Sequence, residues 1–166
     1  MLERSVGLDP TYAPAWGNLG RRYYLDSQYG NGGEAMFQKS NAALERALAL
    51  DPNLSISLGQ RIANRTERGE VVKAYQDAAN WVEQQPKNAM AHFVLGYVLR
   101  YAGLLDESAR ACEDAISLDS GIYLFRACAF TFSQMGNPER AMDFNRLDAA
   151  LVTVAFSRVG SHHPRP

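Results

Sequence analysis

Apolar residues along the chain recur at intervals of three and four, the spacing that places side chains on one face of an α-helix. The clearest case is Trp16, Leu19 and Tyr23, with Gly20 on the same face. A glycine has no Cβ, so a neighbouring helix can approach it closely. A helix with one apolar face must bury that face against other helices. The pattern therefore predicts an all-α protein built from packed helices.

The predicted helices end at turn signals that recur at a fixed interval. Gly69, Gly103 and Gly136 are separated by 34 and 33 residues, and Pro52 and Pro86 by 34. Proline ends a helix because it lacks an N–H, and glycine lets the backbone reverse direction after a helix. The interval predicts a helix–turn–helix repeat in which each copy packs on the next.

The repeat pattern also sets the expected boundaries. Repeats are predicted at approximately 13–52, 55–86, 89–120 and 122–150, after a leading half-repeat at 2–8. The expected helix pairs are 13–26 with 34–50, 55–68 with 71–85, 89–102 with 105–118, and 122–135 with a helix from 138 onward. Residues 1–157 thus form one repeat domain. The polar, proline-ended segment 158–166 is predicted to be a disordered tail.

The first repeat is longer than the others. Pro10 and Pro52 are 42 residues apart, and the glycines and asparagine of segment 27–33 favour an irregular turn there. Two interpretations stay open. Segment 27–33 is either a surface insertion, which costs a folded chain little, or a projection from which Tyr29 reaches a ligand or a partner subunit.

The stretch Trp16-Gly17-Asn18-Leu19-Gly20-Arg21-Arg22-Tyr23 resembles the opening of a tetratricopeptide repeat, and the resemblance extends over roughly residues 2–150. The third copy keeps Leu95-Gly96, with His92 where the family has tryptophan. The resemblance implies a right-handed superhelical solenoid of antiparallel helix pairs. It also implies that the first helix of each pair lines a concave groove, which holds a peptide or helix of a partner protein.

The family's groove-facing positions can be transferred to this chain residue by residue. They alternate between arginines and large apolar or aromatic side chains, a combination typical of binding hot spots. Any single aromatic residue among them could instead pack between repeats. The resemblance gives as candidate ligand-binding residues Arg21, Tyr24, Met90, Phe93, Tyr97, Arg100, Tyr101, Tyr123 and Arg126.

Charge is distributed unevenly between the two helices of each pair, although the formal net charge is only -1. The predicted first helices carry seven arginines and two acidic residues. The second helices, counted with Glu70 directly before 71–85, carry six basic and twelve acidic residues. A basic inner wall concentrates ligands of opposite charge. The expected partner is therefore an acidic protein or peptide.

The C-terminal helix continues with an apolar face that includes Leu151, Val154 and Phe156. Repeat arrays usually end with a polar outer face. We therefore expect a homodimer contact at this end. This apolar face also supports an alternative function, a self-association scaffold within a larger signalling or regulatory protein.

The two cysteines, Cys112 and Cys128, occupy positions where the repeat requires small residues. We expect them to be buried free thiols, with a redox pair as the less favoured alternative, since two cysteines make neither a disulfide framework nor a metal site. This expectation points to a reducing, cytoplasmic setting. No apolar run approaches the ~20 residues that span a bilayer, so no membrane partner is predicted.

The sequence shows no pattern for catalysis. No nucleophile–base pair can be proposed, and His162 and His163 have no third metal ligand nearby. We therefore expect no enzyme activity, no cofactor and no metal. Single-stranded nucleic acid is a less favoured ligand, suggested only because arginines among aromatic residues also suit base stacking.

Overall fold

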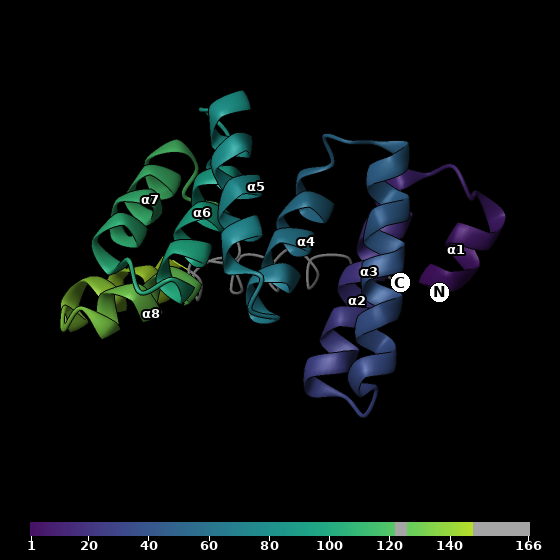
Figure 1. The fold of residues 1–166 in the computed structure, drawn as a ribbon, viewed down its shortest axis with the longest axis horizontal. Helices are drawn as coiled ribbons and strands as arrows, with labels where there is room; N and C mark the ends of the chain where they lie inside the picture. Colours follow the sequence, from purple (N-terminus) through teal and green to yellow (C-terminus); the bar gives the residue numbers. More distant parts are fainter. Residues whose placement is uncertain (122–125, 148–166) are drawn as a thin grey trace, which may run out of the picture. The chain divides into compact units, whose positions relative to one another are not determined.

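The structure is a computed structural model that describes residues 1–121 and 126–147 (Figure 1). Their regular secondary structure is entirely α-helical, which confirms the predicted all-α class. The chain divides into two compact units, one formed by Met1–Glu70 and one that begins at Val71. Each unit is a stack of antiparallel helices.

The first unit contains four helices. They are α1 (Leu2–Leu8), α2 (Ala13–Tyr29), α3 (Gly33–Leu50) and α4 (Ser55–Glu67). The hairpin of α2 and α3 is its centre, with α4 packed on both and α1 packed on α2 (Figure 1). Gly20 lies where α3 crosses α2, and a Cβ there would sit 2.7 Å from Cγ of the fully buried Leu44. The close approach predicted at this glycine is confirmed.

The predicted irregular turn at 27–33 is wrong in its extent. α2 continues to Tyr29, and the turn is only Gly30–Gly32. Ser27, Gln28 and Tyr29 are compatible with helix, and the Ser27 hydroxyl donates to the Tyr24 carbonyl at 2.7 Å. The extra residues therefore lengthen both helices, to 17 and 18 residues, against 13 and 14 in the third repeat.

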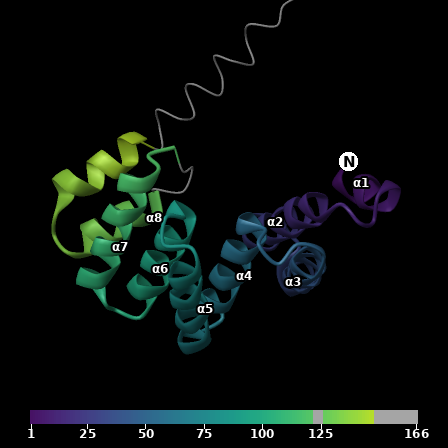
Figure 2. The same ribbon diagram turned by 90° about the horizontal axis from the view of Figure 1, so that it is seen from above.

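The second unit contains the remaining described helices. They are α5 (Val71–Gln84), α6 (Ala89–Tyr101), α7 (Leu105–Leu118), α8 (Arg126–Gln134) and a helix over residues 138–147. α6 packs between α5 and α7, and α8 packs on both α6 and α7 (Figure 2). Two first helices of successive repeats, α6 and α8, are thereby placed side by side.

The repeat is visible in local geometry as well as in sequence. Gly69, Gly103 and Gly136 have φ of +81°, +78° and +73°, a conformation that other residues rarely adopt. The Trp16 indole donates to the carbonyl of Pro10 at 3.0 Å. His92, predicted to replace that tryptophan, donates through Nε2 to the corresponding carbonyl of Pro86 at 2.8 Å.

Several predictions concern residues outside the described part of the chain. These are the tail 158–166, Tyr123, the side chain of Arg126, and the dimer contact at Leu151, Val154 and Phe156. Among the residues that are described, no helix is long and apolar enough to cross a membrane.

Candidate functional site

A cluster of aromatic rings surrounds one arginine on the paired helices α6 and α8. Its members are Tyr97, Arg100 and Tyr101 of α6 and Phe130 of α8, here called the Arg100 cluster. The guanidinium carbon of Arg100 lies 4.7 Å from the Tyr101 ring centre, 5.2 Å from that of Tyr97 and 5.8 Å from that of Phe130. At these distances a guanidinium is attracted to the face of each ring.

The helix spacing explains why these residues meet. Tyr97 and Tyr101 are one turn apart, and their ring centres lie 5.0 Å from each other. The Tyr97 hydroxyl donates to that of Tyr101 at 3.3 Å. Tyr101 is 46% exposed and Phe130 56% exposed, so the outer part of the cluster faces solvent.

Arg100 has rings as neighbours but no acid. No carboxylate among the described residues lies within ion-pair distance of its guanidinium. Its Nε is buried and has no hydrogen-bond acceptor within the described part of the chain. A cation partly removed from water without a counter-charge favours binding of an anionic group from outside.

The structure separates the other predicted residues of this unit from the cluster. Phe93 is only 5% exposed, so it belongs to the packed interior rather than to the accessible surface. Met90 is half-buried in the first turn of α6.

In the first unit, Arg21 and Tyr24 lie on α2, which packs against α4. The Tyr24 hydroxyl contacts both oxygens of Glu67 on α4, at 2.7 and 3.0 Å. Arg21 is half-buried and forms no ion pair with another described residue. The tyrosine predicted to meet a ligand is therefore already bonded to an acid of its own unit, a contact that the sequence analysis did not anticipate.

The basic inner wall predicted from the sequence is partly neutralised in this unit. Arg61 of α4 pairs with Glu45 of α3 at 3.7 Å, and Arg68, which follows α4, pairs with Glu34 of α3. Hydrogen bonds from Gln38 and then from Arg68 lower the pKa of the Glu34 carboxyl. The arginines of the first helices thus meet the acids of the second helices directly.

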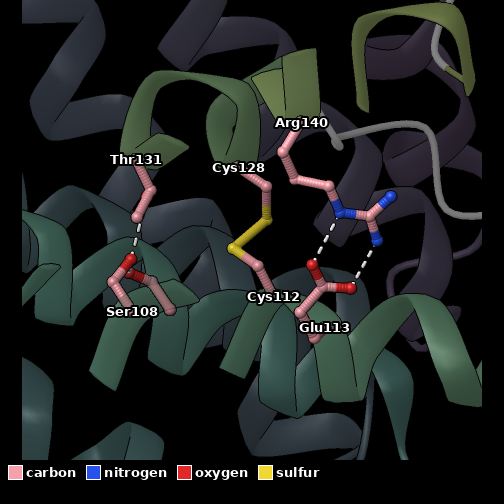
Figure 3. Close-up of a disulfide and its surroundings, with 7 residues drawn as sticks. Ser108, Cys112, Glu113, Cys128, Thr131 and Arg140 are labelled. Carbon is pink, nitrogen blue, oxygen red and sulfur yellow. Dashed lines mark hydrogen bonds and ion pairs between the residues drawn. A yellow bond between two sulfur atoms is a disulfide. The ribbon is translucent and has the colours of Figure 1, made fainter. Parts of the chain in front are cut away.

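The cysteine prediction was half right. Cys112 and Cys128 are each 1% exposed, as expected, but they form a disulfide between α7 and α8 (Figure 3). Their Cα atoms are 5.9 Å apart, a distance that a disulfide spans without backbone movement. In the sequence both cysteines occupy packing positions of successive repeats, and this is the signal that could have indicated their proximity. Disulfides are rare in reducing compartments, so the cysteines no longer support a cytoplasmic setting.

Tyr101 and Phe130, two of the three rings around Arg100, are exposed to solvent. A shallow hollow in this unit is lined by Gly103, Leu104, Leu105, Asp106, Glu107 and Met135, and it does not include the cluster. The described residues contain no group of three or more His, Cys, Asp or Glu side chains placed to hold a metal ion. Exposed rings of this kind suit a segment of another protein better than an enclosed small molecule.

Comparison with known proteins supports the fold assignment. No family model and no curated protein matches the chain. A crystal structure of TTC0263, a thermophilic TPR protein from Thermus thermophilus, matches with a TM-score of 0.62 at 18% identity, over 84% of this chain and 74% of that one. MamA from Desulfovibrio magneticus RS-1 matches with a TM-score of 0.54 at 16% identity, over 92% of this chain and 82% of that one. These similarities show the tetratricopeptide-repeat fold.

Proposed function

We propose that this chain, which has the tetratricopeptide-repeat fold, is a non-catalytic protein-interaction module that binds an acidic peptide or helix of a partner protein. The Arg100 cluster is the candidate binding site. The observation that carries the proposal is a guanidinium held by three rings with no carboxylate of the described chain beside it.

The cluster matches the chemistry of an acidic protein segment. A carboxylate can accept two parallel hydrogen bonds from a guanidinium, and such charge-assisted bonds are about twice as strong as neutral ones. Tyr101 and Phe130 add exposed ring surface for apolar side chains of the ligand. Tyrosine has few rotatable bonds, and the rings around Arg100 already restrict its guanidinium, so ordering these side chains on binding costs less conformational entropy.

Nucleic acid is a weaker match than an acidic peptide. Binding to nucleic acid depends on several arginines or lysines, each contacting a phosphate. Arg22, Arg61 and Arg68 are engaged with acids of their own unit, and the formal net charge of the chain is -1. A single arginine held among rings, as Arg100 is, favours recognition of one carboxylate or a short acidic segment.

The wider sequence predictions remain proposals beside this one. Arg21, Met90, Tyr123 and Arg126 remain candidate ligand contacts. Self-association through Leu151, Val154 and Phe156 would serve a scaffold role. A cytoplasmic location, expected from free thiols, is not needed for either role.

Binding of a defined probe tests the proposal. The probe is a fluorescein-labelled, glutamate-rich peptide, followed by fluorescence anisotropy over a salt series, with the glutamine version of the same peptide as control ligand. Arg100→Gln is expected to weaken binding of the glutamate peptide about tenfold or more. Arg110→Gln removes the same charge from an exposed arginine on α7 and is expected to leave affinity within about twofold.

Three outcomes would contradict the proposal. The first is equal affinity for the glutamate and glutamine peptides. The second is full affinity in Arg100→Gln, provided that thermal unfolding shows the variant to be folded. The third is tighter binding of a labelled single-stranded oligonucleotide than of the peptide at the same salt concentration, which would favour the nucleic-acid alternative.

A further inference from the structure

The covalent link between α7 and α8 lies one helical turn from the proposed binding site. Cys128 anchors α8 through the disulfide to Cys112, and Phe130 of the Arg100 cluster follows two residues later. On α6, Gly96 faces the same disulfide, since a Cβ there would sit 3.1 Å from the Cys112 sulfur. Arg100 is one turn further along α6. The disulfide and the ligand site therefore share α8, and α6 contacts both of them.

A buried hydroxyl pair is a second link between α7 and α8. The Ser108 hydroxyl donates to the Gly96 carbonyl at 2.7 Å and lies 2.9 Å from the Thr131 hydroxyl. Because Ser108 donates its one hydroxyl proton to the Gly96 carbonyl, Thr131 is the donor in the second bond. Ser108 and Thr131 are almost fully buried (Figure 3). The hydroxyl pair orients α8, but it contributes far less than a covalent bond.

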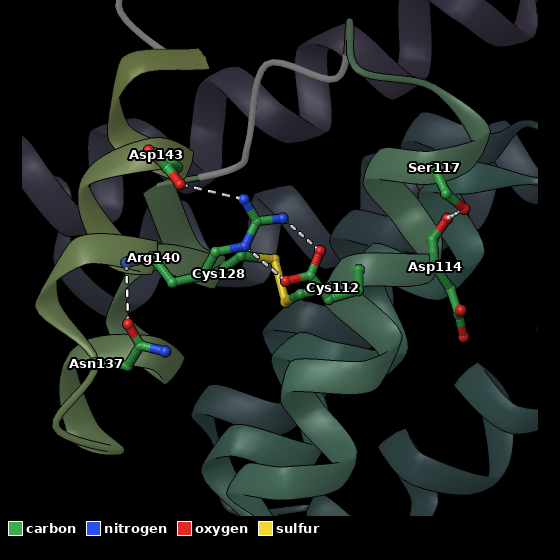
Figure 4. Close-up of polar contacts among 8 residues, drawn as sticks. Cys112, Asp114, Ser117, Cys128, Asn137, Arg140 and Asp143 are labelled. Carbon is green, nitrogen blue, oxygen red and sulfur yellow. Dashed lines mark hydrogen bonds and ion pairs between the residues drawn. A yellow bond between two sulfur atoms is a disulfide. The ribbon is translucent and has the colours of Figure 1, made fainter.

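The helix that follows α8 is attached to α7 by charge. Arg140 donates through Nε to Glu113 at 2.7 Å and through a terminal nitrogen to Asp143 at 3.3 Å (Figure 4). These bonds, above all the one to Glu113, raise the pKa of Arg140. Phe144 packs against Phe132 of α8 with ring centres 5.1 Å apart. The last helix pair thus holds together internally and is joined to α7 by the disulfide, the hydroxyl pair and this ion pair.

The disulfide is the strongest of the attachments that position α8. A helix in a protein gains most of its stability from tertiary packing rather than from its own propensity. Closing a 16-residue separation with a disulfide lowers the entropy of the open chain substantially. Loss of this bond leaves only the buried hydroxyls, the apolar packing and the partly exposed Arg140 pair.

We propose that the Cys112–Cys128 disulfide is a redox-controlled latch that docks α8 on α7 and so completes the Arg100 cluster. A dithiol reductant opens the latch: its two thiols supply two electrons and two protons, the S–S bond becomes two thiols, and the reductant becomes a disulfide. Phe130 then moves away from Arg100, and the ligand site loses one of its three rings. The link to ligand affinity rests on the proposed function, whereas the docking of α8 does not.

Because both sulfurs are buried, the rate of reduction depends on how often α8 opens. A thiolate must reach the bond along its axis, and neither sulfur is accessible while α8 is docked. Reduction therefore requires a transient local opening of α8. A ligand that holds Phe130 and Arg100 together slows this opening, and by linkage it slows reduction.

Hydrogen exchange on the full-length chain tests the docking of α8 without any ligand. Alkylation under denaturing conditions followed by mass spectrometry first counts free thiols in the oxidised and the dithiothreitol-treated protein. Reduction is expected to speed amide exchange in residues 126–134 about 100-fold. Exchange in α2 and α3, in the other unit, serves as the internal control and is expected to stay unchanged.

Variants separate the disulfide from general damage to the fold. Cys112→Ser/Cys128→Ser should reproduce the exchange pattern of the reduced chain, and Cys112→Ala/Cys128→Ala is a second version with no new polar group. Thr131→Val removes the hydroxyl pair but keeps the disulfide. It is expected to change α8 exchange by less than about tenfold.

Two results obtained without a ligand would overturn the latch: free thiols in the protein purified under air, or α8 exchange that is the same in the oxidised and reduced chains. The glutamate-rich probe then connects the latch to function, with an expected affinity loss of about tenfold on reduction. Equal affinity in both states would also contradict the latch. If the oxidised chain does not bind the probe, the proposed function fails, while faster α8 exchange on reduction still supports the latch.

Discussion

Both units pair the first helices of neighbouring repeats, α2 with α4 and α6 with α8. The two paired faces differ in whether a polar side chain has an acidic partner within its own unit. On the face of α2 and α4, the Tyr24 hydroxyl is bonded to Glu67. On the face of α6 and α8, Arg100 is surrounded by rings and has no acid of the described chain as a partner. On the first face a tyrosine is bonded to an acid of its own unit, and on the second face the charge of Arg100 is available for a ligand.

A single position in the repeat accounts for much of this difference. Glu67 lies two residues before Gly69, and Gln134 lies two residues before Gly136, the corresponding glycine two repeats later. The carboxylate of α4 is thus an uncharged amide in α8. Exchanging one surface side chain can therefore decide whether a face of this fold pairs with an acid of its own unit or is available to a ligand. The packing beneath that face does not need to change.

Gln134→Glu should have the largest effect on this comparison. It places a carboxylate on the face of α6 and α8 at the position where Glu67 stands on the other face. We expect the new acid to pair with Arg100 and to repel an acidic ligand, which lowers affinity for the glutamate-rich probe about tenfold (~1.4 kcal/mol) in a fluorescence anisotropy titration.

Asn145→Glu is the matched control for that variant. It adds the same charge at an exposed position on the helix over residues 138–147, away from the paired faces of α6 and α8. Affinity within about twofold of the native chain is expected there. Equal losses in both variants would show that net charge, rather than pairing with Arg100, controls binding.

Tyr24→Phe should affect stability rather than binding. Its hydroxyl bond to a charged, partly buried acceptor is expected to contribute about 1 kcal/mol to the free energy of unfolding, measured by urea denaturation. Tyr29→Phe removes an equivalent hydroxyl from a side chain that is 82% exposed and should change stability little. Loss of probe affinity in Tyr24→Phe without loss of stability would instead place the ligand on the first unit.

Glu67→Gln makes the first unit resemble the second and should have a smaller effect. Removing this carboxylate leaves Arg21 on a face with one negative charge less, so the acidic probe should bind weakly there, in addition to its main site. We expect the apparent affinity to rise about twofold, with the increase lost at high salt. Isothermal titration calorimetry of Glu67→Gln combined with Arg100→Gln isolates this second site, and an absence of binding in that double variant would refute it.

The features predicted correctly from the sequence are those set by spacing along one chain. The 34-residue interval locates the helices, and Gly20 marks a real close approach because a missing Cβ is a property of the residue itself. The equivalence of His92 with Trp16 is also confirmed, since each bonds a carbonyl six residues earlier.

The features that the sequence analysis missed depend on distances between helices. A separation of 16 residues between Cys112 and Cys128 does not specify how close their sulfurs lie, because that depends on how α8 meets α7. Whether Tyr24 meets Glu67 is decided by two flexible side chains on separate helices. Counting charges by helix could not reveal that the acids of α3 neutralise arginines in and after α4.

The smallest predicted effect concerns a second tyrosine–carboxylate contact on α2. The Tyr23 hydroxyl donates to Glu3 of α1 at 2.7 Å, and this bond raises the Tyr23 pKa from 10.0 to about 12. An unfolded tyrosine ionises near 10, so between these values the unfolded chain binds fewer protons than the folded chain. The stabilisation of α1 docking is therefore complete below pH 10 and is lost as the pH rises towards 12.

Ultraviolet absorbance of tyrosinate follows this ionisation directly. In Glu3→Gln the acceptor is neutral, so one tyrosine should move from the high-pH end of the titration towards pH 10. The pH dependence of urea unfolding between about pH 10 and 12 should also be smaller. Glu70→Gln removes an exposed acid elsewhere in the same unit and should leave the titration unchanged. Identical titrations of the native chain and Glu3→Gln would show that α1 is not held to α2 through this carboxylate. The first unit would then lack the Tyr23–Glu3 contact. Its difference from the face around Arg100 would depend only on the hydrogen bond between Tyr24 and Glu67.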